Sequence, residues 1–192
     1  MRFSEFKDKV QDLREFAKGW RGRIYVGFFN GRRVAIKVAK SPEKIEAIRK
    51  EAKILEQLKG VKGFPQIILK GEDFFVYEFI EGITYGKAKL SEEEKKKVLK
   101  SVLEKAYFLD KFGINRDEFS NIHKNVLIDP EGEVYVIDFD RGTFKKNPSN
   151  VRQFLQFLRK EGFVSKERAI DLGKRYKEDP EKVIEEIRKI LT

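Results

Sequence analysis

The sequence predicts an α+β fold in two lobes, with an antiparallel sheet in the first lobe and a reduced, mostly helical second lobe. Asn30-Gly31, a strong hairpin-turn signal, separates two runs rich in β-branched and aromatic residues. A shorter hairpin pattern occupies residues 122–140, and helical periodicity returns after it. We therefore expect the first lobe over residues 1–81 and the second over residues 82–192.

Composition restricts the class of protein. Hydrophobic residues make up 40% of the 192 residues and Phe occurs 17 times, enough for a buried core. There is no cysteine and a single histidine, which excludes disulfides, thiolate metal sites and histidine-cluster metal sites. Charged residues reach 39%, a bias typical of thermophile proteins. Neither a long apolar run nor a signal-peptide pattern occurs, so we expect a cytoplasmic protein without a membrane partner.

The formal net charge is +10, and the cationic surplus lies toward the two ends of the chain. Residues 16–42 contain seven Lys or Arg and no acid, and residues 141–192 contain 14 basic and 8 acidic side chains. Residues 41–140 are slightly acidic, with 17 basic and 20 acidic side chains. The basic ends indicate anionic partners, and an RNA or ribosomal partner is one candidate, although no RNA-binding motif accompanies them.

The first half of the chain predicts a helix before the sheet. Apolar residues recur at helical spacing over residues 3–18, and Gly19 ends this run. They are Phe6, Val10, Leu13 and Phe16. Two strands follow over residues 19–39, and Ser41-Pro42 predicts a helix start with Ser as the N-cap. That helix continues to about residue 58, and residues 66–70 and 74–80 are the next two expected strands.

The second half predicts one long helix, the short hairpin and three further helices. Ser91 and Glu94 match a capping box for a helix that runs to about residue 112 and ends at Gly113. Helical patterns also cover residues 151–160 and 166–177, and a last one starts at residue 180. Ser165 and Asp179 are the predicted caps of the last two helices.

The short hairpin has an oxygen-bearing side chain at each end. Residues 126–128 and 134–137 read as its strands, and residues 130–132 supply the turn. Asn125 precedes the first strand and Asp138 follows the second, so antiparallel pairing brings them together. An amide oxygen and a carboxylate suit Mg²⁺, which prefers oxygen ligands and completes its shell with phosphate and water. We therefore expect Asn125 and Asp138 to be metal ligands.

Two features of the first lobe suit phosphate binding. Lys37 lies near the end of a strand, and Glu51, on the following helix, is placed to orient its ammonium toward phosphate oxygens. Gly19 and Gly22 precede that strand, and glycines let backbone N–H groups approach phosphates closely. Arg21 and Arg23, on either side of Gly22, add positive charge there.

These pieces follow one another in the order of the protein-kinase signature set: Gly-containing turn, VAIK, helix Glu, two strands, helix, Asn, Asp-Phe. The sequence therefore resembles the protein-kinase-like superfamily over residues 15–145. The string IDFDRG, residues 137–142, is especially similar to the lipopolysaccharide-sugar kinase branch, and the small size is similar to RIO-type and related archaeal atypical kinases. The resemblance implies a two-lobed kinase fold and an ATP- and Mg²⁺-dependent phosphotransferase of the Ser/Thr type, with a protein or small-molecule hydroxyl acceptor.

The resemblance also implies roles for individual residues. Lys37 would hold the phosphates, Glu51 would orient Lys37, and Asn125 and Asp138 would hold Mg²⁺. The remaining nucleotide contacts would come from the Gly-containing turn, the opening strands and the YEFIEG hinge. These residues are Gly19, Gly22, Ile24, Ala35, Glu78, Phe79 and Ile80.

Three departures from the family pattern leave alternatives open. The acid that would accept the hydroxyl proton is displaced from its usual position five residues before Asn125. Glu118, followed by the apolar Phe119 as in the usual motif, is the first choice, and Asp117 is the alternative. Asp140 replaces the glycine of the DFG triplet, as a further metal ligand or as a solvent-facing residue. No Ala-Pro-Glu follows, and the segment before the next helix is short. The alternative function is therefore a nucleotide-binding pseudokinase or regulatory scaffold.

Overall fold

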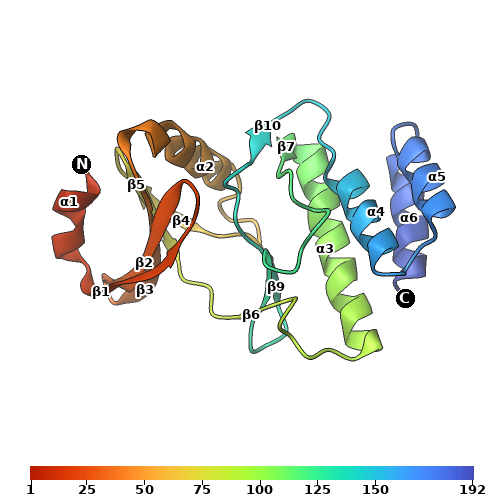
Figure 1. Cartoon of the computed structure of the whole chain (residues 1–192), viewed down its shortest axis with the longest axis horizontal. Coiled ribbons are helices and arrows are strands. Elements are labelled where there is room, and N and C mark those ends of the chain that lie inside the picture. Colours follow the sequence, from red (N-terminus) through yellow and green to blue (C-terminus); the bar gives the residue numbers. More distant parts are fainter. The chain divides into compact units, whose positions relative to one another are not determined.

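The computed structural model describes all 192 residues, Met1–Thr192, as two compact units (Figure 1). The first unit comprises Met1–Glu81 and Asp138–Gly142, and the second comprises Gly82–Ile137 and Thr143–Thr192. The architecture is α+β, as the sequence predicts, with a five-stranded antiparallel sheet and six α-helices. The short segment that begins at Asp138 therefore belongs with the first unit, although the chain on either side of it belongs to the second.

The first unit is an antiparallel sheet with one long helix and a short N-terminal segment. That segment is α1 (Phe3–Phe6) and a 3-10 turn (Lys7–Lys9). A second 3-10 turn (Pro42–Lys44) leads into α2 (Ile45–Gln57). The spatial order of the strands is β1-β2-β3-β5-β4. Their bounds are β1 (Gln11–Lys18), β2 (Gly22–Phe29), β3 (Arg32–Ala39), β4 (Ile67–Lys70) and β5 (Phe74–Glu78).

The two faces of this sheet are covered by different segments. One face is an apolar cluster that Phe6 and Val10 of the N-terminal segment complete. Its sheet members are Val34, Ile36, Val38, Phe74 and Val76. Because side chains alternate along a strand, Ala35 and Lys37 point to the opposite face. A Cβ on Gly22 would lie 3.1 Å from Ile48 of α2 and 3.1 Å from the Lys37 stem, so β2 closely approaches the helix at this position.

The helix predicted over residues 3–18 is wrong beyond the first turns. Helix α1 ends at Phe6, and Gln11–Lys18 is strand β1, paired with β2. Asp12 has a φ of 53°, which a continuous helix does not allow. Phe6 and Val10 recur at helical spacing because both cover the sheet, whereas Phe16 is 57% exposed on the edge strand. Pairing with β2 thus overrides the local helix pattern.

Gly27, in the middle of β2, is the sequence signal for this arrangement. A Cβ at this position would lie 2.6 Å from Val10 Cγ1 and 2.8 Å from the Gln11 carbonyl oxygen. A glycine inside a strand pattern often marks a bulge or a close approach of another backbone. Strand β1 crosses at that point, and its register with β2 is irregular.

The other elements predicted for the first unit are present. Asn30 and Gly31 have φ values of 50° and 75°, as a two-residue hairpin turn requires. The helix predicted from Ser41 begins with the 3-10 turn, and the Ser41 side chain makes no capping hydrogen bond. The Ser41 backbone carbonyl instead accepts from the Lys44 N–H at 3.0 Å. Proline at the first position sets the turn, and the α-helix follows from Ile45.

The second unit contains four helices that pack side by side (Figure 1). They are α3 (Glu92–Phe112), α4 (Asn150–Lys160), α5 (Lys166–Tyr176) and α6 (Pro180–Ile190). Strands β6 (Ile83–Thr84), β8 (Val126–Ile128) and β9 (Val134–Val136) form a small antiparallel sheet. Strand β7 (Ile114–Asn115) pairs with β10 (Thr143–Phe144). None of the helices combines the length and the apolar composition that a membrane-spanning segment needs.

The helix ends of this unit follow the predicted local chemistry. Ser91 and Glu94 form a reciprocal capping box, and Gly113 ends α3 in the left-handed conformation with a φ of 83°. The Ser165 hydroxyl accepts from the Arg168 N–H, and the Asp179 carboxylate accepts from the Lys182 N–H.

Candidate functional site

Lys37 of β3 and Glu51 of α2 form a buried ion pair in the first unit. Lys37 Nζ lies 2.7 Å from Glu51 Oε1, and the two side chains are 8% and 6% exposed. Strand alternation turns Lys37 toward α2, and Glu51 lies on the buried side of that helix beside Ala52. The structure therefore brings together the lysine and the glutamate that the sequence pairs.

The charges of this pair depend on one another. Burial alone would lower the pKa of Lys37, but the carboxylates of Glu51, Asp138 and Asp140 outweigh burial and raise that pKa. Burial raises the pKa of Glu51, and the Lys37 ammonium opposes this change. Removal of either partner would leave the other as an uncompensated buried group.

The segment Asp138-Phe139-Asp140 lies beside this pair in the same unit. Phe139 is buried, and its ring contacts Phe64 edge to face at 6.0 Å. The Phe139 N–H donates to Glu51 Oε2 at 3.3 Å, which ties the segment to α2. Asp138 has a φ of 66°, and its Oδ1 accepts from the Asp140 N–H at 3.1 Å and lies 3.9 Å from Lys37 Nζ. The turn thereby presents a carboxylate that is 42% exposed next to the lysine.

Asp140, which replaces the usual glycine, faces cations rather than open solvent. Its side chain is 17% exposed, and its Oδ1 lies 3.5 Å from Lys37 Nζ. Arg21 Nη1 donates to the Asp140 carbonyl oxygen at 2.7 Å and to Oδ2 at 3.3 Å. Arg21 belongs to the turn between β1 and β2, residues 19–22, here called the glycine turn. The Gly19 N–H donates to the Gly22 carbonyl at 2.8 Å and closes this turn. The glycine turn is thus tied to the Asp138 segment.

The donor set of this cluster suits a magnesium–phosphate group. Three carboxylates face two cations, so the acids exceed the bases by one charge; the five groups are Glu51, Asp138, Asp140, Lys37 and Arg21. No group of three or more His, Cys, Asp or Glu side chains is arranged as a complete metal site. Mg²⁺ in phosphate sites is usually held by one or two carboxylates, with phosphate and water as the other ligands. The half-exposed Asp138 carboxylate is the oxygen donor available for that purpose.

The residues expected to contact the rest of a nucleotide lie on the same sheet or at its end. Ile24 is opposite Lys37 in the β2–β3 register, and Ala35 is two residues before Lys37, so all three share one face. At the end of β5, the Glu78 carboxylate pairs with the exposed Arg32. The Phe79 N–H donates to the Arg33 carbonyl at 3.2 Å, and Ile80 is half-buried. The Phe79 amide is therefore already engaged within the unit.

Asn125 lies in the second unit, at the start of the β8–β9 hairpin. Its carbonyl oxygen accepts from the Ile137 N–H at 2.9 Å, and its N–H donates to the Ile122 carbonyl at 3.2 Å. These bonds extend the hairpin ladder to Ile137, the residue before Asp138. The expected antiparallel pairing is therefore present from Asn125 to Ile137, the residue before Asp138.

The two candidate acids have different surroundings in the second unit. Glu118 Oε2 lies 3.6 Å from Nη2 of Arg116, a guanidinium that is only 1% exposed and donates twice to the Ile137 carbonyl, at 3.1 and 2.7 Å. Asp117 is exposed and has a φ of 70°. Gln153 Nε2 donates to Asp117 Oδ1 at 3.2 Å. Glu118 thus pairs with a structural arginine, whereas Asp117 presents its carboxylate outward.

Helix α4 holds this loop through residues that the sequence did not single out. Gln153 Oε1 accepts from the Phe119 N–H at 3.1 Å, so its amide binds both ends of the Asp117–Phe119 segment. Asn150 is fully buried and accepts from the Arg116 N–H at 2.9 Å, while its Nδ2 donates to the Ile114 carbonyl at 2.7 Å. No local pattern marks these amides, because each binds a segment more than thirty residues away.

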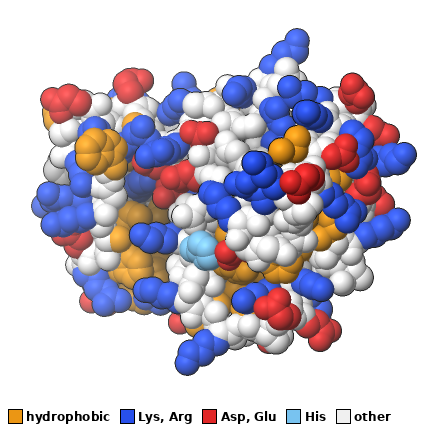
Figure 2. Space-filling view, turned by 45° about the vertical axis from the view of Figure 1, so that its right-hand side comes forward, with side chains coloured by type: hydrophobic (Ala, Val, Ile, Leu, Met, Phe, Trp, Pro, Cys, Tyr) orange, Lys and Arg blue, Asp and Glu red, His pale blue; other side chains and the backbone are white.

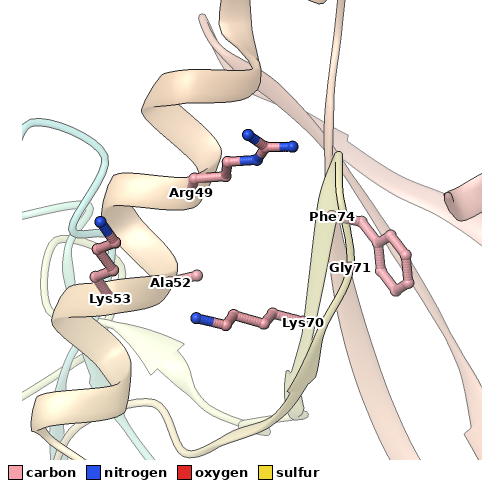
Figure 3. A pocket seen from close by; sticks show the side chains of 6 residues that line it. All are labelled: Arg49, Ala52, Lys53, Lys70, Gly71 and Phe74. Atoms are coloured by element: carbon pink, nitrogen blue, oxygen red, sulfur yellow. The ribbon is translucent and has the colours of Figure 1, made fainter. Parts of the chain in front are cut away.

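A separate small pocket of about 160 Å³ lies in the first unit between α2 and the β4–β5 turn. Figure 3 shows Arg49 and Lys70 reaching across its opening, while the Phe74 ring points away from the helix. Arg49 Nε donates to the Glu72 carbonyl at 3.0 Å, and Lys70 Nζ lies 2.8 Å from Glu56. None of the predicted site residues lines this pocket.

On the face in Figure 2, Lys and Arg side chains are spread out, with Asp and Glu side chains between them. Several of these cations are paired. Arg175 contacts Asp171 and Glu186, and Arg188 contacts Glu104 and Glu185. The expected RNA or ribosomal partner stays a prediction.

One similarity to a known protein accompanies this geometry. The chain is 32% identical over 142 residues to a Bacillus subtilis (strain 168) protein named "Putative serine/threonine-protein kinase YrzF". The aligned region covers 73% of this chain and 64% of that protein. No family model matches the chain. The similarity supports a kinase-like superfamily, and the chain spans less than two thirds of that protein's length.

Proposed function

We propose that this protein is an ATP- and Mg²⁺-dependent phosphotransferase of the atypical Ser/Thr kinase type, small like the RIO-type enzymes, that phosphorylates a hydroxyl acceptor. The observation that carries the proposal is the buried Lys37–Glu51 pair beside the half-exposed Asp138 carboxylate. A buried ion pair is costly to build, and its presence next to an exposed acid favours a site that orients phosphate. The named relative and the ordered motifs support the same class.

In this proposal each residue has a distinct task. Lys37, oriented by Glu51, binds phosphate oxygens, and Asp138 and Asn125 hold Mg²⁺, which supplies charge stabilisation for the transferred group. Ile24 and Ala35 contact the base, and the backbone of residues 78–80 borders it. Asp117 orients the acceptor hydroxyl and accepts its proton, since its carboxylate is exposed while Glu118 pairs with Arg116.

The test uses transfer of the ATP γ-phosphate to water and to the protein itself, so that no acceptor has to be known. We expect Asp117→Asn to lower the rate by about 10²-fold or more, within the range of general-base contributions, with Mg·ATP affinity retained. Glu118→Gln is the matched control and should retain most of the rate. Equal loss in both variants would contradict the assignment of Asp117, and a wild-type protein without transfer would favour the pseudokinase alternative.

A further inference from the structure

Asp140 binds Lys37 and Arg21, the two cations that a nucleotide phosphate would contact in this site. Its carboxylate lies 3.5 Å from Lys37 Nζ, and Arg21 Nη1 contacts both its carbonyl oxygen and its Oδ2. The Arg21 and Asp140 side chains are only 31% and 17% exposed. A phosphate that approached Lys37 and Arg21 would therefore meet a carboxylate that already binds both of them.

The position of Asp140 is fixed by its segment rather than by chance rotation of a surface side chain. The Gly142 N–H donates to the Phe139 carbonyl at 2.9 Å, which closes the turn around Asp140. A Cβ on Gly142 would lie 2.7 Å from Ile54 Cδ1, so the turn packs tightly against α2. Phe139 anchors the same turn through Glu51 and Phe64. The carboxylate is thus built into the cluster.

This arrangement has an electrostatic consequence for nucleotide binding. Without metal, a polyphosphate adds negative charge to a cluster whose carboxylates already exceed its cations by one. A divalent cation beside Asp138 would reverse that balance, and it would draw the Asp140 carboxylate away from Lys37 and Arg21. The two cations would then be available to phosphate oxygens.

We propose, on the basis of the proposed function, that Asp140 determines specificity: it makes the site select the metal complex of the nucleotide over the free nucleotide. Arg21 is the second phosphate-binding cation in this proposal, and it is paired with Asp140 in the absence of metal. When the metal–nucleotide complex binds, Arg21, in the turn between β1 and β2, exchanges its contact with Asp140 for a contact with phosphate.

The first experiment measures ATP affinity by calorimetry, once in EDTA and once with Mg²⁺. We expect wild type to bind ATP at least tenfold more tightly with Mg²⁺. Asp140→Asn, which keeps the shape and removes the charge, should tighten binding in EDTA by about tenfold, a change of about 1.4 kcal/mol. The ratio of the two dissociation constants should fall accordingly. A ratio that is unchanged in Asp140→Asn would overturn the proposal.

Arg21→Met tests the role of the second cation, with Arg23→Met as its matched control. Arg23 is an exposed arginine two residues along the chain. Arg21→Met should weaken Mg·ATP binding by about tenfold and Arg23→Met by less than twofold. Equal effects would show that only general positive charge matters, and the assignment of Arg21 would be wrong.

The single tryptophan provides a readout that needs no nucleotide. Trp20 is next to Arg21 and is 76% exposed, so its fluorescence anisotropy reports the mobility of the glycine turn. In ligand-free protein, Asp140→Asn and Arg21→Met should each lower that anisotropy, and Arg23→Met should not. Unchanged anisotropy would contradict the Arg21–Asp140 contact itself. Absence of Mg·ATP binding by wild type would instead contradict the proposed function, whatever Trp20 reports about the turn.

Discussion

The polar cluster of the first unit and that of the second are built on different principles. Around Lys37, five ionised side chains lie together, the acids are in excess, and Asp138 is 42% exposed. Around Asn150, a fully buried amide binds the backbone of the Asp117 loop and the carboxylate of Asp110. The Asp110 carboxylate also accepts from the Val151 N–H and the Tyr176 hydroxyl.

This difference separates a cluster that can bind a ligand, around Lys37, from one that has a structural role, around Asn150. The second cluster consists mainly of neutral donors and acceptors that satisfy one another, so any exchange of partners would cost hydrogen bonds. The first cluster has a surplus of negative charge and an exposed carboxylate, so a divalent cation can enter it with a gain in free energy. We infer that the first cluster can exchange partners and that the second holds the Asp117 loop in place.

The largest expected effect comes from the Lys37–Glu51 pair. Lys37→Met leaves a buried carboxyl without its cation and should lower the free energy of unfolding by about 3–5 kcal/mol. The double variant Lys37→Met/Glu51→Gln should recover part of that stability, but phosphoryl transfer should stay lower by orders of magnitude in both. Urea unfolding and ATP turnover separate the two effects. A double variant with restored transfer would show that Lys37 has only a structural role.

The second cluster should behave in the opposite way. Asn150→Ala removes the partner of the buried Arg116 N–H and of the Ile114 carbonyl, and should lower the free energy of unfolding by about 2–4 kcal/mol. Mg·ATP affinity, measured on folded protein below the unfolding transition, should change less than threefold. A large loss of affinity with intact stability would contradict the distinction between the ligand-binding cluster and the structural one.

Much of the fold follows from local chemistry. The turn at Asn30-Gly31, the capping box at Ser91 and the C-cap at Gly113 each depend on residues within a few positions of one another, and the structure has all three. Strand β1 was not predicted, because Phe6, Val10 and Leu13 recur at the spacing of a helix. The structure shows that this spacing arises because all three pack on the sheet. Pairing with β2 decides its conformation, and Gly27 was the one local sign of it.

The same limit applies to the candidate site. The Lys37–Glu51 pair could be anticipated, because a strand lysine and the next helix pack together in sequence order. The partners of Asp140 and the amides of α4 could not, since they come from segments that only the tertiary fold brings near. Arg21 and Asp140 are 119 positions apart, and Gln153 and Asp117 are 36 apart. Asp140 was recognisable only as a departure from the family triplet.

A smaller effect should follow from Gln153, which positions Asp117. Gln153→Leu removes the donor to Asp117 and the acceptor for the Phe119 N–H. We expect kcat to fall by about tenfold with the KM for Mg·ATP nearly unchanged, and Gln153→Glu to retain the Phe119 contact but not the rate. Gln156→Leu, on the same helix, is the control. A change in KM alone would indicate that Gln153 acts elsewhere.

The smallest expected effect concerns the surface pair between α3 and α6. The Arg188 guanidinium contacts Glu104 at 2.5 and 2.9 Å and lowers the pKa of that carboxyl, against the effect of partial burial. A depressed folded-state pKa contributes stability above the unfolded pKa, and this contribution is lost as the pH falls through the folded value. Glu104→Gln should therefore cost about 0.5–1 kcal/mol at pH 7 in urea unfolding, and progressively less as the pH falls below the unfolded pKa and through the folded one.

Glu185→Gln, which removes a single contact to the same arginine, is the matched control and should cost less at pH 7. A loss for Glu104→Gln that persists undiminished at low pH would mean that packing, and not the charge pair, stabilises this contact.

The most direct test of the proposed phosphate site is a calorimetric titration of wild type and Asp138→Ala with ATP, each with and without Mg²⁺. We expect wild type to bind tightly only with Mg²⁺, and Asp138→Ala to lose most of the increase in affinity that Mg²⁺ provides. Binding that is equally tight without metal, or unaffected by Asp138→Ala, would contradict a magnesium–phosphate site at Lys37 and Asp138.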